Sequence, residues 1–242
     1  QKLIVPHQTL TLLVLQDARK LNQKVQQLKL AALGQLSASI AHEIRNPLAA
    51  IVQANELLAD SDSDQQQHLS QMIAKQALRI DCIIQDTLNM VRNKETYPTQ
   101  LQLNQFIPTF LQEDLADVAQ QINYNIQDKM AITFDEAQLR QILINLLRNA
   151  IRHNVPAQAK IELNIYAHES NVRIDVRDFG SGVASQDLAY LFQPFFSTEI
   201  TGTGLGLYLS RSFCEANQAE LSYVEQKQGA CFRIECPHVA LN

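Results

Sequence analysis

Two long segments with helical periodicity, separated by a short polar turn, restrict the fold of this chain most strongly. Apolar residues recur every three to four positions from about residue 20 to 58 and again from about residue 65 to 93. The run ADSDSD between them contains residues that commonly end and begin helices. Two such helices joined by a short loop form an αα-hairpin. A hairpin buries little alone, so we expect a second copy to complete a four-helix bundle, with a plain coiled coil as the alternative.

The second half of the chain alternates helical and strand patterns. The stretch NKETYPTQLQLNQF (93–106) predicts a linker, because Pro98 ends helical character. After it, helices are expected at 104–120, 136–152 and 204–217, and strands near 130–134 and in KIELNIYAH, NVRIDVRD, AELSYVEQ and ACFRIECP. This order predicts an α/β sandwich with helices on one face of a sheet, so the whole chain is of the α+β class. One further strand is expected at the other end, around residues 9–15.

Composition excludes some functions. The net charge is −5 and the charged residues are mixed along the chain, which argues against nucleic-acid binding. No apolar run approaches the roughly 20 residues that span a bilayer, although the chain lacks an initial Met and an upstream membrane anchor stays open. The four cysteines have no zinc-site spacing and are expected to be reduced core thiols. We therefore expect a cytoplasmic chain, with or without an anchor upstream.

A lone histidine lies on the polar side of the first predicted helix. In SASIAHEIRNPLAAI (37–51), apolar residues share one face and His42 falls on the opposite face. Such a histidine is usually an ordinary solvated residue. Here Glu43 could accept the proton of one ring nitrogen, which would leave the other as a nucleophile, and Asn46 could hold a water one turn away. These neighbours make His42 a candidate phosphoacceptor.

A second group of residues could bind a nucleotide without a Walker motif. In NLLRNAIRH (145–153), Asn145 and Asn149 share one helix face, and Arg152 and His153 follow one turn later. Amide oxygens suit Mg²⁺, and an arginine can contact a phosphate directly. Solvated asparagines on an amphipathic helix are the alternative.

Glycines mark two loops after this helix. Asp178 ends a predicted strand in VRDFGSGV, where its carboxylate could accept a hydrogen bond from adenine, although an ordinary strand-to-loop turn would look similar. TGTGLGL (201–207) then opens a helix, and the backbone N–H groups at a helix start can bind phosphate. Five of the seven glycines lie in these two loops: Gly180, Gly182, Gly202, Gly204 and Gly206.

In this order the motifs resemble those of sensor histidine kinases over residues 20–237. HEIRNPL is similar to the phosphoacceptor box, and NLLRNAIRH to the box that binds the metal ion; DFGSG, LFQPFFS and GTGLGL are similar to the first glycine box, the F-box and the second glycine box. The wording around the histidine is most similar to PilS-type and NtrB-type kinases. The resemblance implies the end of a PAS-like sensor domain at 1–17, a signalling helix with the dimerisation and phosphotransfer domain at 18–94, a hinge linker at 95–104, and a Bergerat-fold (GHKL-like) ATP-binding domain at 105–242.

The resemblance also implies roles for single residues. His42 is the expected phosphoacceptor, Glu43 its general base, and Glu43 with Asn46 matches a pattern for dephosphorylating the partner regulator. Asn149 is the expected Mg²⁺ ligand. The residues implied in ATP binding are Asn145, Asn149, Arg152, His153, Asp178, Gly180, Gly182, Phe192, Gly202, Thr203, Gly204, Leu205 and Gly206.

These roles describe an autokinase that uses ATP and Mg²⁺ and passes the phosphoryl group to an aspartate of an NtrC-like response regulator. The resemblance implies a homodimer and no nucleic-acid or membrane partner for this segment. Glu199 departs from the pattern, since lysine is common there and an acid would repel phosphate. The alternative function is a related ATPase without histidine phosphorylation, but such enzymes usually carry a water-activating glutamate where this chain has Asn145. A Ser/Thr kinase, suggested by RDFG, lacks its other motifs.

Overall fold

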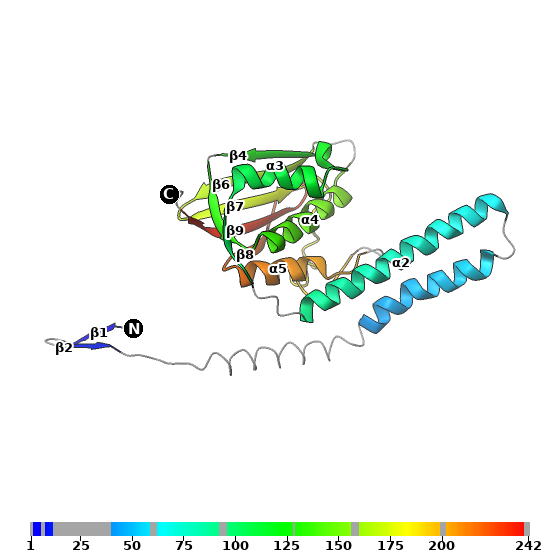
Figure 1. The fold of residues 1–242 in the computed structure, drawn as a ribbon, viewed down its shortest axis with the longest axis horizontal. Coiled ribbons are helices and arrows are strands. Elements are labelled where there is room, and N and C mark those ends of the chain that lie inside the picture. The colour runs from blue at the N-terminus through cyan, green and yellow to red at the C-terminus, as the bar shows by residue number, and fades with distance from the viewer. Residues whose placement is uncertain are drawn as a thin grey trace.

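The structure is a computed structural model. It describes residues 2–5, 8–11, 40–58, 62–91, 96–127, 129–155, 160–198 and 202–239. Within this part the chain forms a two-stranded sheet, a helical hairpin, and a mixed α/β domain (Figure 1). The predicted signalling helix before residue 40 and the residue Glu199 lie outside the described residues.

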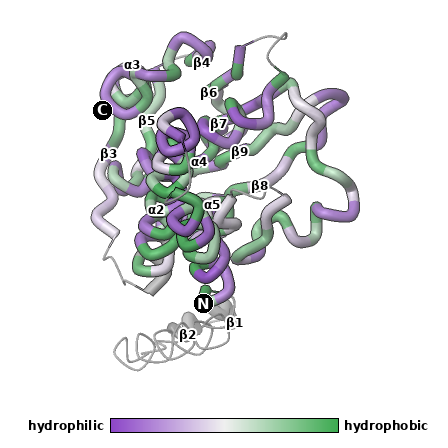
Figure 2. Tube along the Cα trace, turned by 90° about the vertical axis from the view of Figure 1, so that its right-hand side faces the viewer, coloured by the Kyte–Doolittle hydropathy of each residue, from purple (hydrophilic) through white to green (hydrophobic). Residues whose placement is uncertain are grey.

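The helical hairpin is confirmed. Residues 40–58 are helical, and α2 (Ser63–Val91) returns beside them (Figure 1). Ala54 and Ile83 are buried apolar residues in the described part of the hairpin. Figure 2, which views the hairpin nearly end-on, shows both hydrophobic and hydrophilic positions in its helices. Much of the apolar surface of the hairpin remains exposed in the single chain, so the hairpin does not complete its own core.

The strand expected around residues 9–15 is confirmed over residues 9–11, the part of it that the structure describes, as β2 (Gln8–Thr11). It pairs antiparallel with a strand that was not expected, β1 (Lys2–Val5). The prediction treated β1 as a lead-in, although its Leu-Ile-Val run has high strand propensity. Residues 12–15 lie outside the described part.

The α/β domain is built on a seven-stranded sheet with the order β3-β5-β9-β7-β6-β4, and β8 pairs with β9. The strands are β3 (Thr99–Gln102), β4 (Ile122–Ile126), β5 (Ala131–Phe134), β6 (Ile161–His168), β7 (Asn171–Arg177), β8 (Glu220–Val224) and β9 (Cys231–Val239). The helices are α3 (Leu103–Asp114), α4 (Glu136–His153) and α5 (Gly206–Ala216), with a short 3₁₀ turn η1 (Ala119–Gln121). The predicted α/β sandwich is therefore confirmed.

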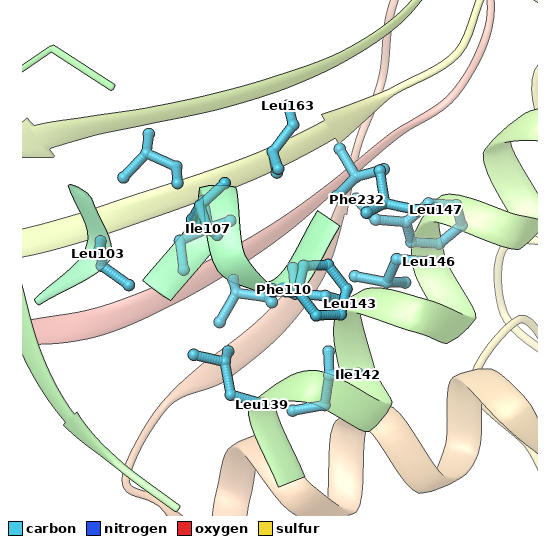
Figure 3. Packing of buried hydrophobic residues seen from close by; sticks show 14 of the residues in the cluster. Leu103, Ile107, Phe110, Leu139, Ile142, Leu143, Leu146, Leu147, Leu163 and Phe232 are labelled. Carbon is cyan, nitrogen blue, oxygen red and sulfur yellow. The ribbon is translucent and has the colours of Figure 1, made fainter. Parts of the chain in front are cut away.

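The core lies between this sheet and its helices. Alternate residues of β6 and β7 are buried, and they meet the apolar stripe of α4 (Figure 3). Figure 3 shows α3 residues Ile107 and Phe110 between the strands and α4. Asn145 and Asn149 lie at the edge of this stripe and are half-buried.

The linker predicted at 95–104 is too long. Residues 99–102 form β3, which pairs antiparallel with β5, and α3 begins at Leu103 rather than 104 and ends at Asp114 rather than near 120. Both β3 and β4 were missed. The sequence TQLQ buries one apolar side chain and INYNI contains two asparagines, so neither shows a clear strand pattern. Their pairing partners in the sheet, rather than local propensity, make them strands.

Asp135 fastens the end of the linker to the α/β domain. Its side chain caps α4 by accepting from Gln138 N at 3.1 Å, and its other oxygen accepts from Tyr97 N at 3.0 Å. The backbone N–H of Asp135 in turn donates to the side chain of Asn217 at 2.8 Å. The connection between hairpin and α/β domain is therefore held in place from Tyr97 onward.

Three of the four cysteines are core thiols as predicted, and none of the four forms a disulfide. Burial raises the pKa of Cys231 and Cys236 to about 12, which keeps these thiols protonated and unreactive. The prediction is wrong for Cys82, which is exposed on α2. Among the described helices, none combines the length and apolar character needed to cross a bilayer.

Candidate active site

The predicted phosphoacceptor is accessible. His42 is exposed on the helix of residues 40–58, while Pro47 on the other side of the helix is buried. The side-chain amide of Asn46, one turn further on, lies 3.5 Å from His42 Nδ1. The roles in this contact depend on the imidazole tautomer: the amide donates from Nδ2 to an unprotonated Nδ1, or turns so that its Oδ1 accepts from a protonated Nδ1. The contact leaves Nε2 as the ring nitrogen that is open to a reaction partner.

Glu43 does not contact the histidine in this conformation. Its Oε2 atom instead lies 3.5 Å from Nη2 of Arg79 on α2. The same nitrogen of Arg79 donates to the backbone carbonyl of Gly202 at 3.4 Å. The Arg79 side chain therefore links Glu43, the residue next to His42, to the glycine-rich loop.

The asparagines of α4 have separate tasks. Asn145 Nδ2 donates to Ser210 on α5 at 3.0 Å, which joins the two helices. A Cβ atom at Gly206 would lie 2.2 Å from Asn145 Oδ1, so only glycine lets the start of α5 approach this amide. Asn149 is half-buried one turn later, and no hydrogen bond of its side chain occurs among the described residues. Asn149 is therefore the amide that remains available to a ligand.

Asp178 is held at the end of β7 by backbone groups. The residue is 4% exposed, and its Oδ1 accepts from Gly180 N at 2.9 Å and from Ala230 N at 3.0 Å. Its own N–H donates to the carbonyl of Ala230 at 3.0 Å. These bonds fix the orientation of the carboxylate and occupy one oxygen, so Oδ2 is the atom that can accept from a ligand.

Two residues that sequence reasoning missed support Asp178. A Cβ atom at Gly229 would lie 1.9 Å from the carbonyl oxygen of Asp178, and Gly229 has a φ of 78°. Asn154 accepts from Phe179 N at 3.0 Å and so holds the loop after the aspartate. Gly229 lies 51 positions from Asp178 in the sequence, and only the pairing of β7 with β9 brings them together. Asn154 directly follows the NLLRNAIRH motif, and this position is a signal by which the sequence could have identified it.

The first glycine loop packs against the end of α4. A Cβ atom at Gly180 would lie 2.1 Å from the carbonyl oxygen of His153, whose own side chain is exposed. Gly182 has a φ of 73° and faces the carbonyl of Gly229. Arg152 is exposed at the same end of α4. The structure thus gathers His153, Gly180 and Gly182, predicted to lie near the adenine, around the same end of this helix as Arg152.

The second glycine loop leads into α5. Gly204 has a φ of 67° and packs on the backbone of Phe195, and Thr203 Oγ1 accepts from Leu205 N at 3.3 Å. No side chain caps α5, so the backbone N–H groups of its first turn can donate to an anion in front of the helix.

The predicted F-box residue supports this helix from the side. The ring of Phe192 meets Phe232 edge-on, with centroids 6.4 Å apart. The guanidinium of Arg211 on α5 lies 5.2 Å from the centroid of the Phe192 ring. Phe192 therefore packs in the wall of the domain beside α5.

The described residues contain no cluster of three histidine, cysteine or acidic side chains that could hold a metal ion alone. A metal ion here would depend on the oxygens of a bound nucleotide and water as well as on the protein. The free amide of Asn149 is a ligand of the hard oxygen type that Mg²⁺ prefers. The donor set therefore fits a magnesium-nucleotide complex.

Comparison with known proteins gives the same two domains. Residues 32–96 match the family "His Kinase A (phospho-acceptor) domain", and residues 134–240 match the family "Histidine kinase-, DNA gyrase B-, and HSP90-like ATPase". The second match implies ATP binding by the α/β domain.

Individual relatives agree. The chain is 38% identical over 237 residues to sensor protein kinase PilS of Pseudomonas aeruginosa, covering 94% of this chain and 45% of the relative. It is 32% identical over 230 residues to the signal transduction histidine-protein kinase AtoS of Escherichia coli (strain K12), covering 91% and 38%. Among solved structures, histidine kinase ThkA in complex with response regulator protein TrrA matches with a TM-score of 0.75 at 22% identity, covering 91% of this chain and 66% of that one, and so supports the fold.

The chain spans less than half the length of these two curated relatives. Within that span it carries both matched domains in the order hairpin, then α/β domain. The chain therefore belongs to the sensor histidine kinases of two-component systems, and it holds their phosphoacceptor and ATPase domains.

Proposed function

We propose that this chain is an autokinase that transfers the γ-phosphoryl group of ATP to Nε2 of His42. One observation carries the proposal: the exposed histidine adjoins Glu43, which is joined through Arg79 to the glycine-rich loop at Gly202. The donor loop and the acceptor helix therefore meet in one chain.

The nucleotide is held by the ends of α4, β7 and α5. Asp178 Oδ2 accepts a hydrogen bond from the adenine amine, while the N–H groups at the start of α5 bind phosphate oxygens. Arg152 supplies positive charge near the phosphates. Asn149 would hold Mg²⁺, which neutralises phosphate charge when bound.

In the transfer step, the Nε2 lone pair forms a bond to the γ-phosphorus and the bond from this phosphorus to the β,γ-bridging oxygen breaks. ADP leaves with the electron pair of that bond. The imidazole becomes positively charged, and its Nδ1 proton then passes to a base. Glu43 takes this role after the transfer, once a rotamer change turns its half-buried side chain from Arg79 to the ring.

Hydrolysis without a phosphohistidine is the alternative function. It needs a base to activate water, and the side chain at the relevant place is the amide of Asn145, which cannot take a proton near neutral pH. This amide donates to Ser210 instead. Because Asn145 makes a structural hydrogen bond and cannot act as a base, this position supports a kinase rather than an ATPase.

We also propose that the phosphoryl group passes from His42 to an aspartate of an NtrC-like response regulator. The same histidine face, with Asn46 beside it, would orient water for dephosphorylating that regulator. The setting we propose is the cytoplasm, which supplies ATP. The exposed apolar residues of the hairpin support a homodimer, since a single hairpin leaves them in water.

The test is incubation with γ-labelled ATP and Mg²⁺, comparing the wild-type chain with His42→Gln. The matched control is His68→Gln, which removes an exposed histidine of α2. We expect acid-labile, base-stable label on the wild type and on the control, and none on His42→Gln. Release of free phosphate without bound label, unchanged in His42→Gln, would mean an ATPase and contradict the proposal.

Transfer is tested by adding the receiver domain of an NtrC-like regulator to the labelled chain. We expect label to move to the receiver within minutes, and to be lost from it faster with the wild-type chain than with Asn46→Ala. A receiver domain from another regulator class serves as the specificity control. Equal transfer to both would contradict the assignment of the partner class.

A further inference from the structure

We propose that Arg79 is a positioning residue that holds the glycine-rich loop beside the phosphoacceptor. The proposal rests on the proposed kinase function and adds to it a residue of α2 that lies in none of the recognised motifs. Its basis is the pair of contacts made by one nitrogen of this side chain.

Arg79 Nη2 lies 3.5 Å from Glu43 Oε2 and 3.4 Å from the carbonyl oxygen of Gly202. One terminal nitrogen of a guanidinium carries two hydrogens, so it can donate to both acceptors at once. The Arg79 and Glu43 side chains are 16% and 24% exposed, which shields the contact from much of the solvent. Three segments are thereby joined: the helix of residues 40–58, α2, and the loop before α5.

The contact lies where the two domains meet. The side of the hairpin that carries Glu43 and Arg79 faces the α/β domain, and α2 contacts α5 there (Figure 1). A fixed charge with several donors on a long stem suits a bridge between a carboxylate and a backbone carbonyl. A shorter or neutral side chain at position 79 would reach one acceptor or neither.

The bridge affects the geometry of transfer rather than ATP binding. The residues proposed to bind ATP all lie on the α/β domain, whereas Arg79 lies on the hairpin. Phosphoryl transfer requires the γ-phosphorus and the ring nitrogen to approach within roughly 3–3.5 Å, and a displacement of about 1 Å can cost about 100-fold in rate. Arg79 limits this displacement by tying the loop to the residue that adjoins His42.

The experiment measures initial rates of His42 labelling against ATP concentration for the wild-type chain, R79A, R79K and the control K75A. Lys75 is an exposed cation one turn earlier on α2. Affinity for a fluorescent ATP analogue is measured in parallel. We expect kcat to fall tenfold or more in R79A, KM and the affinity to stay within twofold of wild type, R79K to recover part of the rate, and K75A to match wild type.

A double-mutant cycle with E43Q separates positioning from general structural damage. If Arg79 acts partly through Glu43, R79A causes a smaller fold loss in the E43Q background than in the wild type. R79Q, which keeps the aliphatic stem, replaces R79A in both comparisons if R79A fails to fold, as judged by circular dichroism.

The outcomes are distinct. If the wild type is labelled and R79A has an unchanged kcat, the role of Arg79 is overturned while the kinase proposal stands. The same holds if R79A causes the same fold loss in the E43Q background as in the wild type. A fall in ATP affinity equal to the fall in rate would also overturn it, since that result assigns Arg79 to nucleotide binding. A wild-type chain that carries no label overturns the kinase proposal itself.

Discussion

At the scale of single residues, the candidate site depends on groups that fix the orientation of others. Asp178 can present one carboxylate oxygen to a ligand because two backbone N–H groups hold the other. Asn145 similarly joins α4 to α5 and leaves Asn149 for the ligand. A polar group that is already oriented loses little freedom when a ligand binds.

Gly229→Ala tests this support. The added Cβ would fall 1.9 Å from the carbonyl oxygen of Asp178, at a residue with a φ of 78°, so backbone must move. We expect the free energy of unfolding to drop by more than about 2 kcal/mol, from strain and steric overlap. Because the displaced backbone belongs to Asp178, ATP affinity should fall at least tenfold.

Urea unfolding and titration with a fluorescent ATP analogue measure the two effects of this substitution. Lys227→Ala, at an exposed position of the same loop, is the control and should change neither quantity. Wild-type ATP affinity in Gly229→Ala would show that the Asp178 carboxylate does not depend on the backbone behind it.

At the scale of elements, the outer face of the sheet is a set of cross-strand ion pairs. Arg173 on β7 lies opposite Glu235 on β9 and donates to it at 2.6 Å. Arg233 on β9 lies opposite Asp175 on β7, and the two side chains pair at 2.7 Å. The inner face of the same strands is apolar. Paired charges allow this sheet to cover its core on one side and meet water on the other.

Glu235 gives this face a predictable response to pH. Hydrogen bonds from Arg173 and then from Asn171 hold the pKa of Glu235 below its usual range. A carboxyl group with a lowered pKa in the folded state stabilises the fold above its unfolded pKa of about 4.3, and this stabilisation is lost as the pH falls through the lowered value.

We therefore expect Glu235→Gln to reduce the free energy of unfolding by about 0.5–1 kcal/mol at pH 7, the range for a partly exposed pair. The difference from wild type should begin to shrink as the pH drops below about 4, where the carboxyl group of the unfolded chain becomes protonated, and should vanish as the pH falls through the lowered pKa of the folded state. Urea unfolding at several pH values measures it. Glu225→Gln, at an exposed position after β8, is the control. A difference that is constant between pH 7 and pH 3.5 would contradict the assigned role of the charge.

At the scale of the whole molecule, the hairpin has two sides with different partners. At about 100° per residue, Leu48 and Val52 lie on one side of the helix of residues 40–58, and Ile84 and Leu88 lie on the matching side of α2. All four are large, apolar and exposed in the single chain. Glu43 and Arg79 lie on the other side of the hairpin, which meets the α/β domain. The apolar side is therefore the one available to a second copy.

Val52→Glu should disrupt the proposed dimer. Val52 is 49% exposed in the single chain, and a charge in a dimer interface would be buried without a partner. We expect the dimer to weaken more than about 100-fold, a loss of about 3 kcal/mol. Sedimentation velocity over a range of concentrations measures the change. The control Gln53→Glu places the same charge on the neighbouring exposed residue, which falls on another side of the helix. Equal weakening by both substitutions would exclude this face as the interface.

Local patterns in the sequence were sufficient for the helical hairpin, α4, α5, the central strands, and the motifs that carry His42, Asn149, Asp178 and the glycine loops. Each of these depends on residues close in sequence, whose spacing decides which face of a helix they share or which loop they form. The edge strands β3 and β4 could not be found in this way, because their short, polar sequences become strands only through their partners β5 and β6.

Contacts between distant residues were decided only by the tertiary structure. Gly229 supports Asp178 across the β7–β9 pair, and the Asn145 amide donates to Ser210. Arg79 joins Glu43 to Gly202, which lies 123 residues after Arg79 in the sequence. Spacing along the chain has no bearing on such pairs, since the packing of whole elements sets which side chains meet. The sequence alone therefore predicted the chemical groups proposed to bind and react, and the fold determined how they are held.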